Sequence, residues 1–224
     1  MKKKIVLIVL LVLPLSCYIY FALAKHNALN LPVINENVSE LPQGTTLDNK
    51  PVALQGNITI VGFLGTDITK KKETVFNINE KINNKYKGFT DFQIVMLLPE
   101  GEEQEVQKVM DELKVMADIS NWRFLFVKPD QIAEFHQSLK VKESLDADSG
   151  SYYLFIIDKE RKLRGRDGKM KDKKTGKYEF KDGYNSFVVA ELHNEMTDDI
   201  KILLREYRLA LKKNNDQKGV KREI

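Results

Sequence analysis

The chain is almost without cysteine. Its one cysteine, Cys17, lies inside an apolar run near the N-terminus, and every later residue is something else. Disulfide exchange needs a thiolate as nucleophile, and sulfur ligation of zinc or copper needs the same group. The sequence therefore excludes thiol redox chemistry and thiolate metal sites from the part of the chain beyond residue 24.

Histidine is scarce as well, with three in 224 residues. His26, His136 and His193 are too far apart in the sequence to indicate a metal site, and we expect each at the surface, with Phe135 as the core residue beside His136. The methionines at apolar periodic positions are predicted to be core residues rather than thioether ligands; they are Met96, Met110, Met116 and Met196. The sequence thus indicates no cofactor and no metal.

Basic and acidic side chains are nearly equal in number, 36 against 32. The formal net charge is +4, and Lys2, Lys3 and Lys4 supply most of it. No nucleic-acid partner is indicated, because the rest of the chain is close to neutral overall. The exception is residues 161–181, where ten basic residues face three acidic ones. We expect this basic insertion, residues 161–183, to be a solvated loop that extends a β-hairpin; contact with anionic lipid headgroups or an acidic partner stays open.

Residues 5–24 contain no charged side chain. As a helix with a rise of about 1.5 Å per residue, this run would span about 30 Å, the thickness of the hydrocarbon core of a bilayer. The lysines before it should remain cytoplasmic, so we expect 1–24 to be a single-pass membrane anchor with the following domain on the extracytoplasmic (periplasmic) side. A signal peptide cleaved after Ala22-Leu23-Ala24 and a lipoprotein signal at Leu15-Ser16-Cys17 remain alternatives.

Hydrophobic periodicity predicts a polar tether over 25–50, one domain over 51–211 and a flexible polar tail over 212–224. Apolar runs typical of buried strands alternate with helical patterns; the predicted strands are 57–64, 92–98, 122–127, 152–158 and a short one from 163. The helical patterns follow Asp67 as a possible N-cap, then cover 106–116, 129–139 and 186–211. The expected fold is α/β, with a mixed central sheet flanked by helices and a β-hairpin before the last helix.

This order of elements resembles the thioredoxin-like superfamily and, within it, the Sco/SenC family of copper chaperones for cytochrome oxidase assembly. The resemblance covers about residues 55–210. Its most specific part is the hairpin over 154–165, which reads Leu154-Phe155-Ile156-Ile157-Asp158 before its turn and Leu163-Arg164-Gly165 after it. A strand containing Trp122 supports it, and residues 184–213 are similar to the C-terminal helix of membrane-anchored homologues of the Bacteroidetes type. The resemblance implies a thioredoxin-like fold.

The resemblance also implies a copper site whose ligands this chain lacks. In the family, two cysteines of a CxxxC loop and one histidine bind the metal, and the corresponding positions here hold Asp67, Lys71 and Gly150. A lysine ammonium has no acceptor for a cation. The cis-proline loop of the superfamily is absent too, because no proline follows residue 129. The chain is therefore similar to a degenerate family member without copper or redox chemistry.

We expect such a protein to act without catalysis, by binding a protein partner of the envelope or of a respiratory complex during assembly. The candidate partner surface comprises Gly65, Thr66, Asp67, Lys70, Lys71, Arg164 and Arg166. The alternative is a copper metallochaperone that uses non-standard ligands. An enzyme independent of cysteine has no group of residues to support it.

Overall fold

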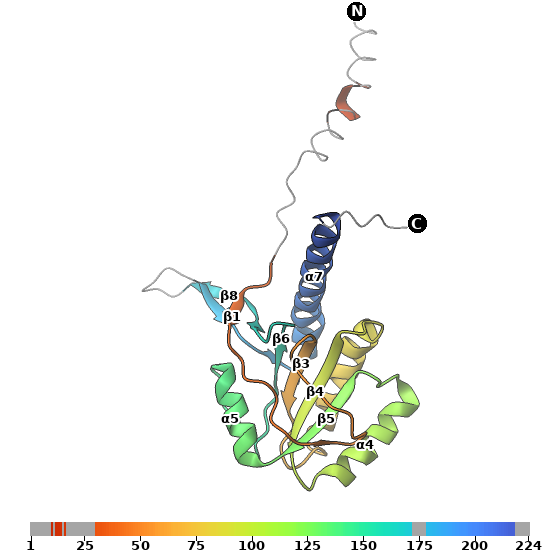
Figure 1. The fold of residues 1–224 in the computed structure, drawn as a ribbon, viewed down its shortest axis with the longest axis vertical. Helices are drawn as coiled ribbons and strands as arrows, with labels where there is room; N and C mark the ends of the chain where they lie inside the picture. Colours follow the sequence, from red (N-terminus) through yellow and green to blue (C-terminus); the bar gives the residue numbers. More distant parts are fainter. Residues whose placement is uncertain (1–9, 11, 15, 17–29, 172–177, 218–224) are drawn as a thin grey trace, which may run out of the picture.

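The computed structural model describes residues 10, 12–14, 16, 30–171 and 178–217 (Figure 1). Within these residues, none of the helices combines the length and the apolar character that crossing a bilayer requires. Most of the predicted anchor, residues 1–24, lies outside the described part of the chain.

A mixed sheet forms the centre of the domain. The strands follow one another across it in the order β1-β7-β6-β3-β4-β5-β2, with β10 also paired to β6. β3, β4 and β5 are parallel, whereas β6 runs antiparallel to β3. The strand bounds are β1 Val33–Asn35, β2 Thr45–Thr46, β3 Ile58–Phe63, β4 Phe92–Pro99, β5 Trp122–Val127, β6 Tyr153–Ile157, β7 Leu163–Arg164 and β10 Tyr184–Asn185. The predicted mixed sheet and its closing hairpin are confirmed.

Helices cover both faces of this sheet. Side chains alternate between the faces along each strand, so that Ile58 and Ile60 enter one core while Val61 and Phe63 enter the other. The first core lies under α2 to α3, α4, and η2 to α7; the second lies under α5 and residues 38–54. The helical segments are α2 Lys72–Ile78, η1 Asn79–Asn83, α3 Asn84–Tyr86, α4 Glu103–Met116, α5 Pro129–Leu139, α6 Val189–Glu191, η2 Leu192–Met196 and α7 Thr197–Gln217.

The described part of the predicted tether, residues 30–50, belongs to the fold. Leu31, Val38 and Leu41 are buried, and the segment adds a strand to each edge of the sheet, β1 against β7 and β2 against β5. Covering an edge removes unpaired backbone groups that would otherwise be exposed. Strands of two or three residues, set among prolines and polar residues, are too short to give a periodic signal in the sequence.

The basic insertion interrupts the strand that pairs with β6 on the side away from β3. Leu163 and Arg164 of β7 pair with Ile157 and Ile156 of β6, and β10 then resumes the pairing at Leu154. The register on β6 therefore continues as if residues 166–183 were absent. Those residues contain their own antiparallel pair, β8 Arg166–Lys171 with β9 Tyr178–Lys181. The described part of the insertion is a second hairpin rather than a loop.

Two predicted helix starts differ from the structure. The first helix begins at Lys72, with Lys71 at its N-cap position, whereas Asp67 accepts hydrogen bonds from the backbone of the preceding turn. The last helical stretch begins at Val189, whose side chain is exposed rather than part of the apolar face.

That last stretch also continues beyond the predicted boundary at 211. The backbone of α7 is helical to Gln217, so the first six residues of the predicted flexible tail extend the helix. Residues 218–224 lie outside the described part of the chain.

Candidate functional site

The end of β3 turns sharply at Gly65. This glycine has a φ of +73°, and a Cβ added to it would come within 2.8 Å of the Asp148 carbonyl oxygen. The loop from Asp146 to Ser151 lies against it, because Leu64 forms a bridge with Gly150 and the Ser151 N–H donates to Phe63 O at 2.8 Å. Only glycine combines this backbone conformation with so close an approach.

Lys71 points into this loop and forms an ion pair there. Its Nζ lies 2.9 Å from Asp146 Oδ2, and the lysine side chain is 7% exposed while the aspartate is 47% exposed. A Cβ built on Gly150 would overlap Lys71 Nζ. The same ammonium lies 5.5 Å from the centre of the Tyr152 ring. The space in front of Gly150, where a longer side chain would project, is therefore filled by the lysine.

Asp146 organises the loop around this ion pair. Its Oδ1 accepts the backbone N–H groups of Asp148 at 3.0 Å and of Gly150 at 2.6 Å. Partial burial alone would raise the pKa of Asp146, but the hydrogen bonds from Lys71 and Gly150 outweigh it and hold the pKa below its usual value. The carboxylate is thus ionised at neutral pH and compensates the buried ammonium.

Asp67 does not join this cluster. It pairs with Lys70 at 3.3 Å and accepts the N–H groups of Thr69 and Lys70 at 3.1 and 3.3 Å. Desolvation would raise the pKa of Asp67, but the hydrogen bonds with Lys70 lower it. Of the three positions to which the resemblance assigns family ligands, Lys71 and Gly150 lie in contact, while the Asp67 carboxylate caps its own turn.

This set of groups does not fit copper. Cu(I) prefers soft sulfur donors, whereas the cluster offers a cation, a glycine and a carboxylate already occupied by backbone amides. Among the residues that the structure describes, no group of three or more His, Cys, Asp or Glu is placed to hold a metal ion. The positive charge at this site is the ammonium of Lys71, which pairs with Asp146.

An exposed apolar patch adjoins the ion pair. Tyr152, Phe187 and Val188 are 40%, 62% and 44% exposed, and the two rings make an edge contact at 5.8 Å. Ser186 fixes their positions, since its Oγ donates to Tyr152 O at 2.6 Å. We call these three residues the aromatic patch. Sequence reasoning missed it, because Val188 and Val189 look like the apolar start of a helix.

Sequence reasoning also missed Asp146 as the partner of Lys71. Its only local signal is the Asp146-Ala147-Asp148-Ser149-Gly150 run, in which an aspartate followed by small and polar residues is typical of a turn that the side chain caps. The turn is local, but its contact with Lys71 is set by the tertiary fold.

The predicted partner surface is only partly accessible. Thr66 and Lys70 are exposed and Asp67 is half-buried, but Gly65 and Lys71 are buried. Arg164, also predicted for this surface, is 7% exposed. A residue this deeply covered cannot contact a partner without a change in the fold.

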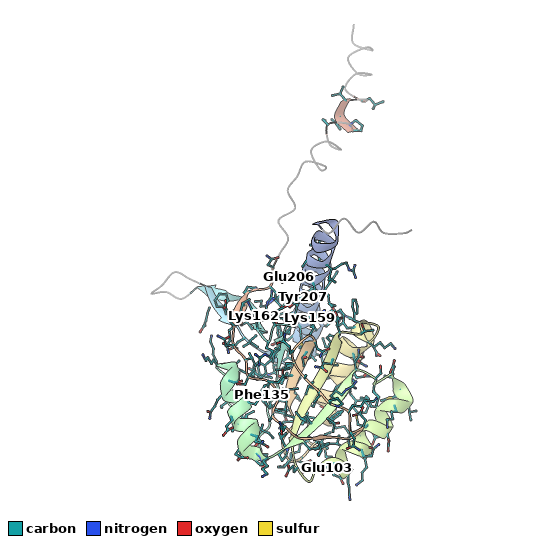
Figure 2. All side chains as sticks on the ribbon, in the orientation of Figure 1. Glu103, Phe135, Lys159, Lys162, Glu206 and Tyr207 are labelled. Atoms are coloured by element: carbon teal, nitrogen blue, oxygen red, sulfur yellow. The ribbon has the colours of Figure 1, made fainter. Side chains whose placement is uncertain are left out.

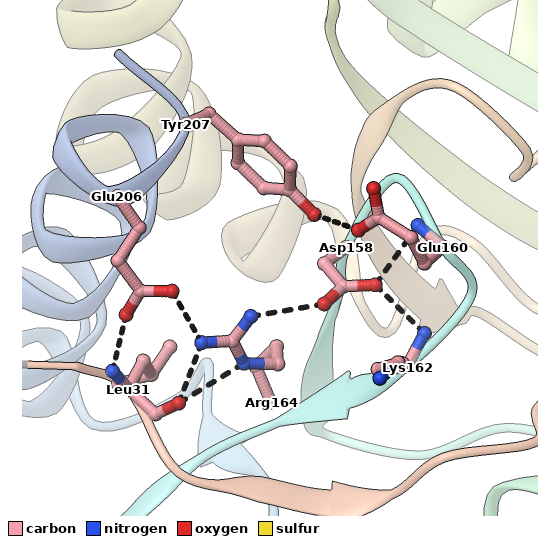
Figure 3. A network of polar contacts seen from close by, with 7 residues as sticks. All are labelled: Leu31, Asp158, Glu160, Lys162, Arg164, Glu206 and Tyr207. Carbon is pink, nitrogen blue, oxygen red and sulfur yellow. Dashed lines mark hydrogen bonds and ion pairs between the residues drawn. The ribbon is translucent and has the colours of Figure 1, made fainter. Parts of the chain in front are cut away.

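Arg164 instead lies at the centre of a network (Figure 3). Its guanidinium donates to Asp158 at 2.9 Å and to Glu206 of α7 at 2.6 Å, and twice to Leu31 O. Glu206 also accepts the Leu31 N–H at 2.5 Å. Burial alone would lower the pKa of Arg164, but the bonds to Glu206 and Asp158 raise it. We call these four residues the entry clamp, because they fix the chain where it enters the domain.

Arg166, the last predicted surface residue, is 30% exposed and contacts Asp199 at 3.1 Å and Glu195 at 3.7 Å. Burial is the main reason that the pKa of Asp199 is raised, although Tyr184 and Arg166 bond to its charged form. Arg166 therefore compensates the charge of a buried carboxylate. Less of its positive charge is available to a partner than its position in the basic insertion suggests.

The histidine and methionine predictions hold in part. His136 is half-buried, with its ring 5.2 Å from that of Phe63, and burial lowers its pKa; the prediction of a surface position was wrong. Phe135 is a core residue as predicted, and His193 is exposed. His26 lies outside the described residues. The methionines at positions 96, 110 and 196 are buried, but Met116, the last residue of α4, is 61% exposed.

No protein-family model and no curated protein matches the chain. Among solved structures, it is similar to BsSco, a member of the Sco family of cytochrome c oxidase assembly proteins, with 18% identity, a TM-score of 0.48, and 76% of this chain and 92% of that chain covered. It is also similar to copper-bound ScoI of Bradyrhizobium japonicum (14% identity, TM-score 0.42, 75% and 97% covered).

A third similar structure is the thioredoxin domain of a thiol-disulfide oxidoreductase from Bacteroides vulgatus, with 18% identity, a TM-score of 0.40, and 59% of this chain and 86% of that chain covered. At these identities and TM-scores, none of the three likenesses carries a conclusion about metal binding or activity.

Proposed function

We propose that this chain is a membrane-anchored, extracytoplasmic Sco-like protein that binds a protein partner during assembly of a respiratory complex or of the envelope. In this proposal the domain performs no metal or thiol chemistry of its own. The order of strands and helices and the hairpin over 154–165 support the Sco-like assignment, and the uncharged run over 5–24 supports the anchor.

The observation that carries the proposal is the Lys71–Asp146 ion pair. Where the Sco family has metal-binding side chains, this chain has two opposite charges that neutralise each other, and the lysine fills the space in front of Gly150. A buried lysine needs such compensation because an unpaired charge is costly away from water. What remains at this end of the sheet is a surface formed by the aromatic patch, with Thr66 and Lys70 exposed on the loop that carries Lys71.

Exposed apolar side chains that touch one another are typical of an interaction surface. Aromatic residues contribute more than other types to the free energy of protein association. We therefore place the contact with the partner on the aromatic patch rather than on Arg164 or Arg166, which are engaged within the domain.

The alternative, a copper metallochaperone with non-standard ligands, requires Lys71 to leave its position and lose Asp146. No other described cluster offers a metal three suitable ligands. The ion pair therefore counts against this alternative.

A photocrosslinking amino acid at Phe187, in the full chain and in its own membranes, tests the partner-binding proposal. We expect a discrete crosslinked product, whose yield falls when Tyr152 is replaced by alanine, because this removes the second ring of the aromatic patch. The matched control carries the crosslinker at the exposed Gln104 of α4.

The proposal is contradicted if position 187 captures the same set of proteins as position 104. It is also contradicted if the Tyr152→Ala variant, still folded, gives an unchanged product.

A further inference from the structure

The C-terminal half of α7 projects from the domain. Figure 1 shows the dark blue end of this helix extending beyond the sheet, at the end of the molecule where the continuously described stretch 30–171 begins. Ile200 and Leu203 are buried where the helix packs on the core, but Leu209 and Leu211 further along are 43% and 59% exposed. At about 100° of rotation per residue, Leu211 continues the face of Ile200 and Leu203, whereas Leu209 lies on the opposite side of the helix. About half of each of these two side chains is left uncovered by the described part of the chain.

The entry clamp fixes this projecting helix to the N-terminal segment. The Leu31 N–H donates to Glu206 of α7, and Leu31 O accepts from Arg164. The base of the basic insertion joins them, because the Gly165 N–H donates to Pro32 O at 3.1 Å. Chain entry, basic hairpin and α7 therefore meet at one end of the domain.

Figure 2 shows the same polarity, with Glu206 and Tyr207 close to Lys159 and Lys162 and with Glu103 of α4 at the opposite end. Any membrane to which residues 5–24 anchor the chain must face the end that holds the entry clamp.

The length of α7 beyond the clamp is similar to the reach of the connection between the uncharged run and Leu31. α7 continues eleven residues from Glu206 to Gln217, which corresponds to about 16 Å of helix. Between the uncharged run and Leu31 lie residues 25–30, which span about 20 Å at most when extended. A domain held by this short connection keeps the end of α7 within reach of the bilayer surface.

The charge of the projecting half suits an anionic surface. Arg205, next to Glu206 of the clamp, and Arg208, beyond it, are exposed; Lys212 and Lys213 follow in the sequence, whereas the next acidic residue after Glu206 is Asp216. Basic side chains beside exposed leucines are the combination that binds a helix to a bilayer containing anionic lipids.

We propose that α7 from the entry clamp outward, through Arg205, Arg208, Leu209 and Leu211, binds the anionic lipid surface of the membrane in which the chain is anchored. The helix then acts as a strut that, with the entry clamp, holds the aromatic patch at a fixed height and orientation above the bilayer. This inference rests on the proposed membrane anchor.

The test uses the full chain with Cys17→Ser, labelled with an environment-sensitive fluorophore at Leu211→Cys. It is reconstituted into vesicles of phosphatidylcholine alone or with phosphatidylglycerol, each containing a lipid that carries a quencher near the headgroup. The matched control carries the label at Gln104→Cys, at the opposite end of the domain. We expect quenching at position 211 to exceed that at 104 by about fivefold in anionic vesicles and to fall with added salt.

Reversal of charge in Arg205→Glu with Arg208→Glu should remove this difference while the protein still floats with the vesicles. Equal quenching at 211 and 104 in protein that floats would overturn the inference and leave the anchor intact. A fluorescence change at 211 that depends on protein density and occurs without quenching by lipid would overturn it in favour of a second copy of the chain. Protein that does not float with vesicles would overturn the anchor, and the inference with it.

Discussion

Lys71 determines what the site at the end of β3 can do. Its ammonium is nearly buried, and its compensation comes from Asp146, seventy-five positions away in the sequence. The resemblance to the Sco/SenC family assigned positions 71 and 150 to two of the family's ligands, and the structure brings these two into contact. The sequence did not indicate Asp146 as the partner of Lys71, because a contact between two loops depends on how the whole sheet places them.

A double-mutant cycle tests the packing of Lys71 against Gly150. Gly150→Ala places a Cβ where Lys71 Nζ lies, so the lysine must move away from Asp146. We expect the substitution to lower the free energy of unfolding by about 1–2 kcal/mol in the natural chain and by less than about 0.5 kcal/mol in a Lys71→Ala background. Chemical denaturation measures both values. Equal losses in the two backgrounds would show that the lysine does not occupy this space.

The pH dependence of stability tests the role of Asp146. Its pKa is lowered in the folded state, so the carboxylate contributes stability above its unfolded pKa, near 4, and loses that contribution as pH falls through the lower folded value. The difference in unfolding free energy between the natural chain and Asp146→Asn should be present at neutral pH and vanish in acid. It should not exceed about 1 kcal/mol, because the carboxylate is half exposed.

Asp148→Asn, in the same loop, is the control for this measurement. A difference between the natural chain and Asp146→Asn that stays constant down to the acid transition would contradict the account.

At the scale of elements, the entry clamp joins three segments that are far apart in the sequence: the chain entry at Leu31, the hairpin of β6 and β7, and α7 (Figure 3). The hairpin and the last helix were predicted from their own periodicity. The clamp was not, because Arg164 looked like one more cation of a basic insertion. Only the tertiary structure shows that Asp158 and Glu206 surround it.

Arg164→Met should therefore destabilise the domain strongly. The substitution leaves Asp158, which is 1% exposed, without its cationic partner, and breaking a buried pair in this way costs about 3–5 kcal/mol. Lys162→Met is the control, since Lys162 enters the network through its backbone N–H. Denaturation with urea measures both variants. A loss for Arg164→Met no larger than that of the control would show that the clamp does not stabilise the fold.

The inserted hairpin should be removable without loss of the fold. Asp167 and Phe180 are directly paired, so Asn-Gly in place of residues 168–179 supplies the two-residue turn that an antiparallel pair requires. Arg166 and Lys181 are kept. We expect the free energy of unfolding to change by about 1 kcal/mol or less, because the lost Lys142–Glu179 ion pair is exposed.

Deletion of the whole segment 166–183 is the contrasting variant. It keeps the β6 register but removes Arg166 from the buried Asp199, and it should be markedly less stable. Similar stability of the two variants would contradict the role given to Arg166.

At the scale of the whole molecule, the mostly apolar strands of six or more residues were predictable from the sequence. β5 has the predicted bounds, and β3 and β4 differ by a residue at their ends. The edge strands β1 and β2 were not predictable, because their pairing partners rather than their own residues define them. The aromatic patch was missed for a similar reason: Phe187 and Val188 are apolar, and only the fold leaves them exposed.

The central proposal is that this domain is Sco-like but performs no copper chemistry. Anaerobic titration of the full chain, with Cys17→Ser, by Cu(I) against a competing chelator tests it most directly. Because Lys71 and Asp146 neutralise each other where a metal would bind, the account predicts no stoichiometric complex tighter than micromolar. A complex of one Cu(I) per chain that is tighter than micromolar, and that is lost in Asp67→Ala or Asp146→Ala, would contradict it.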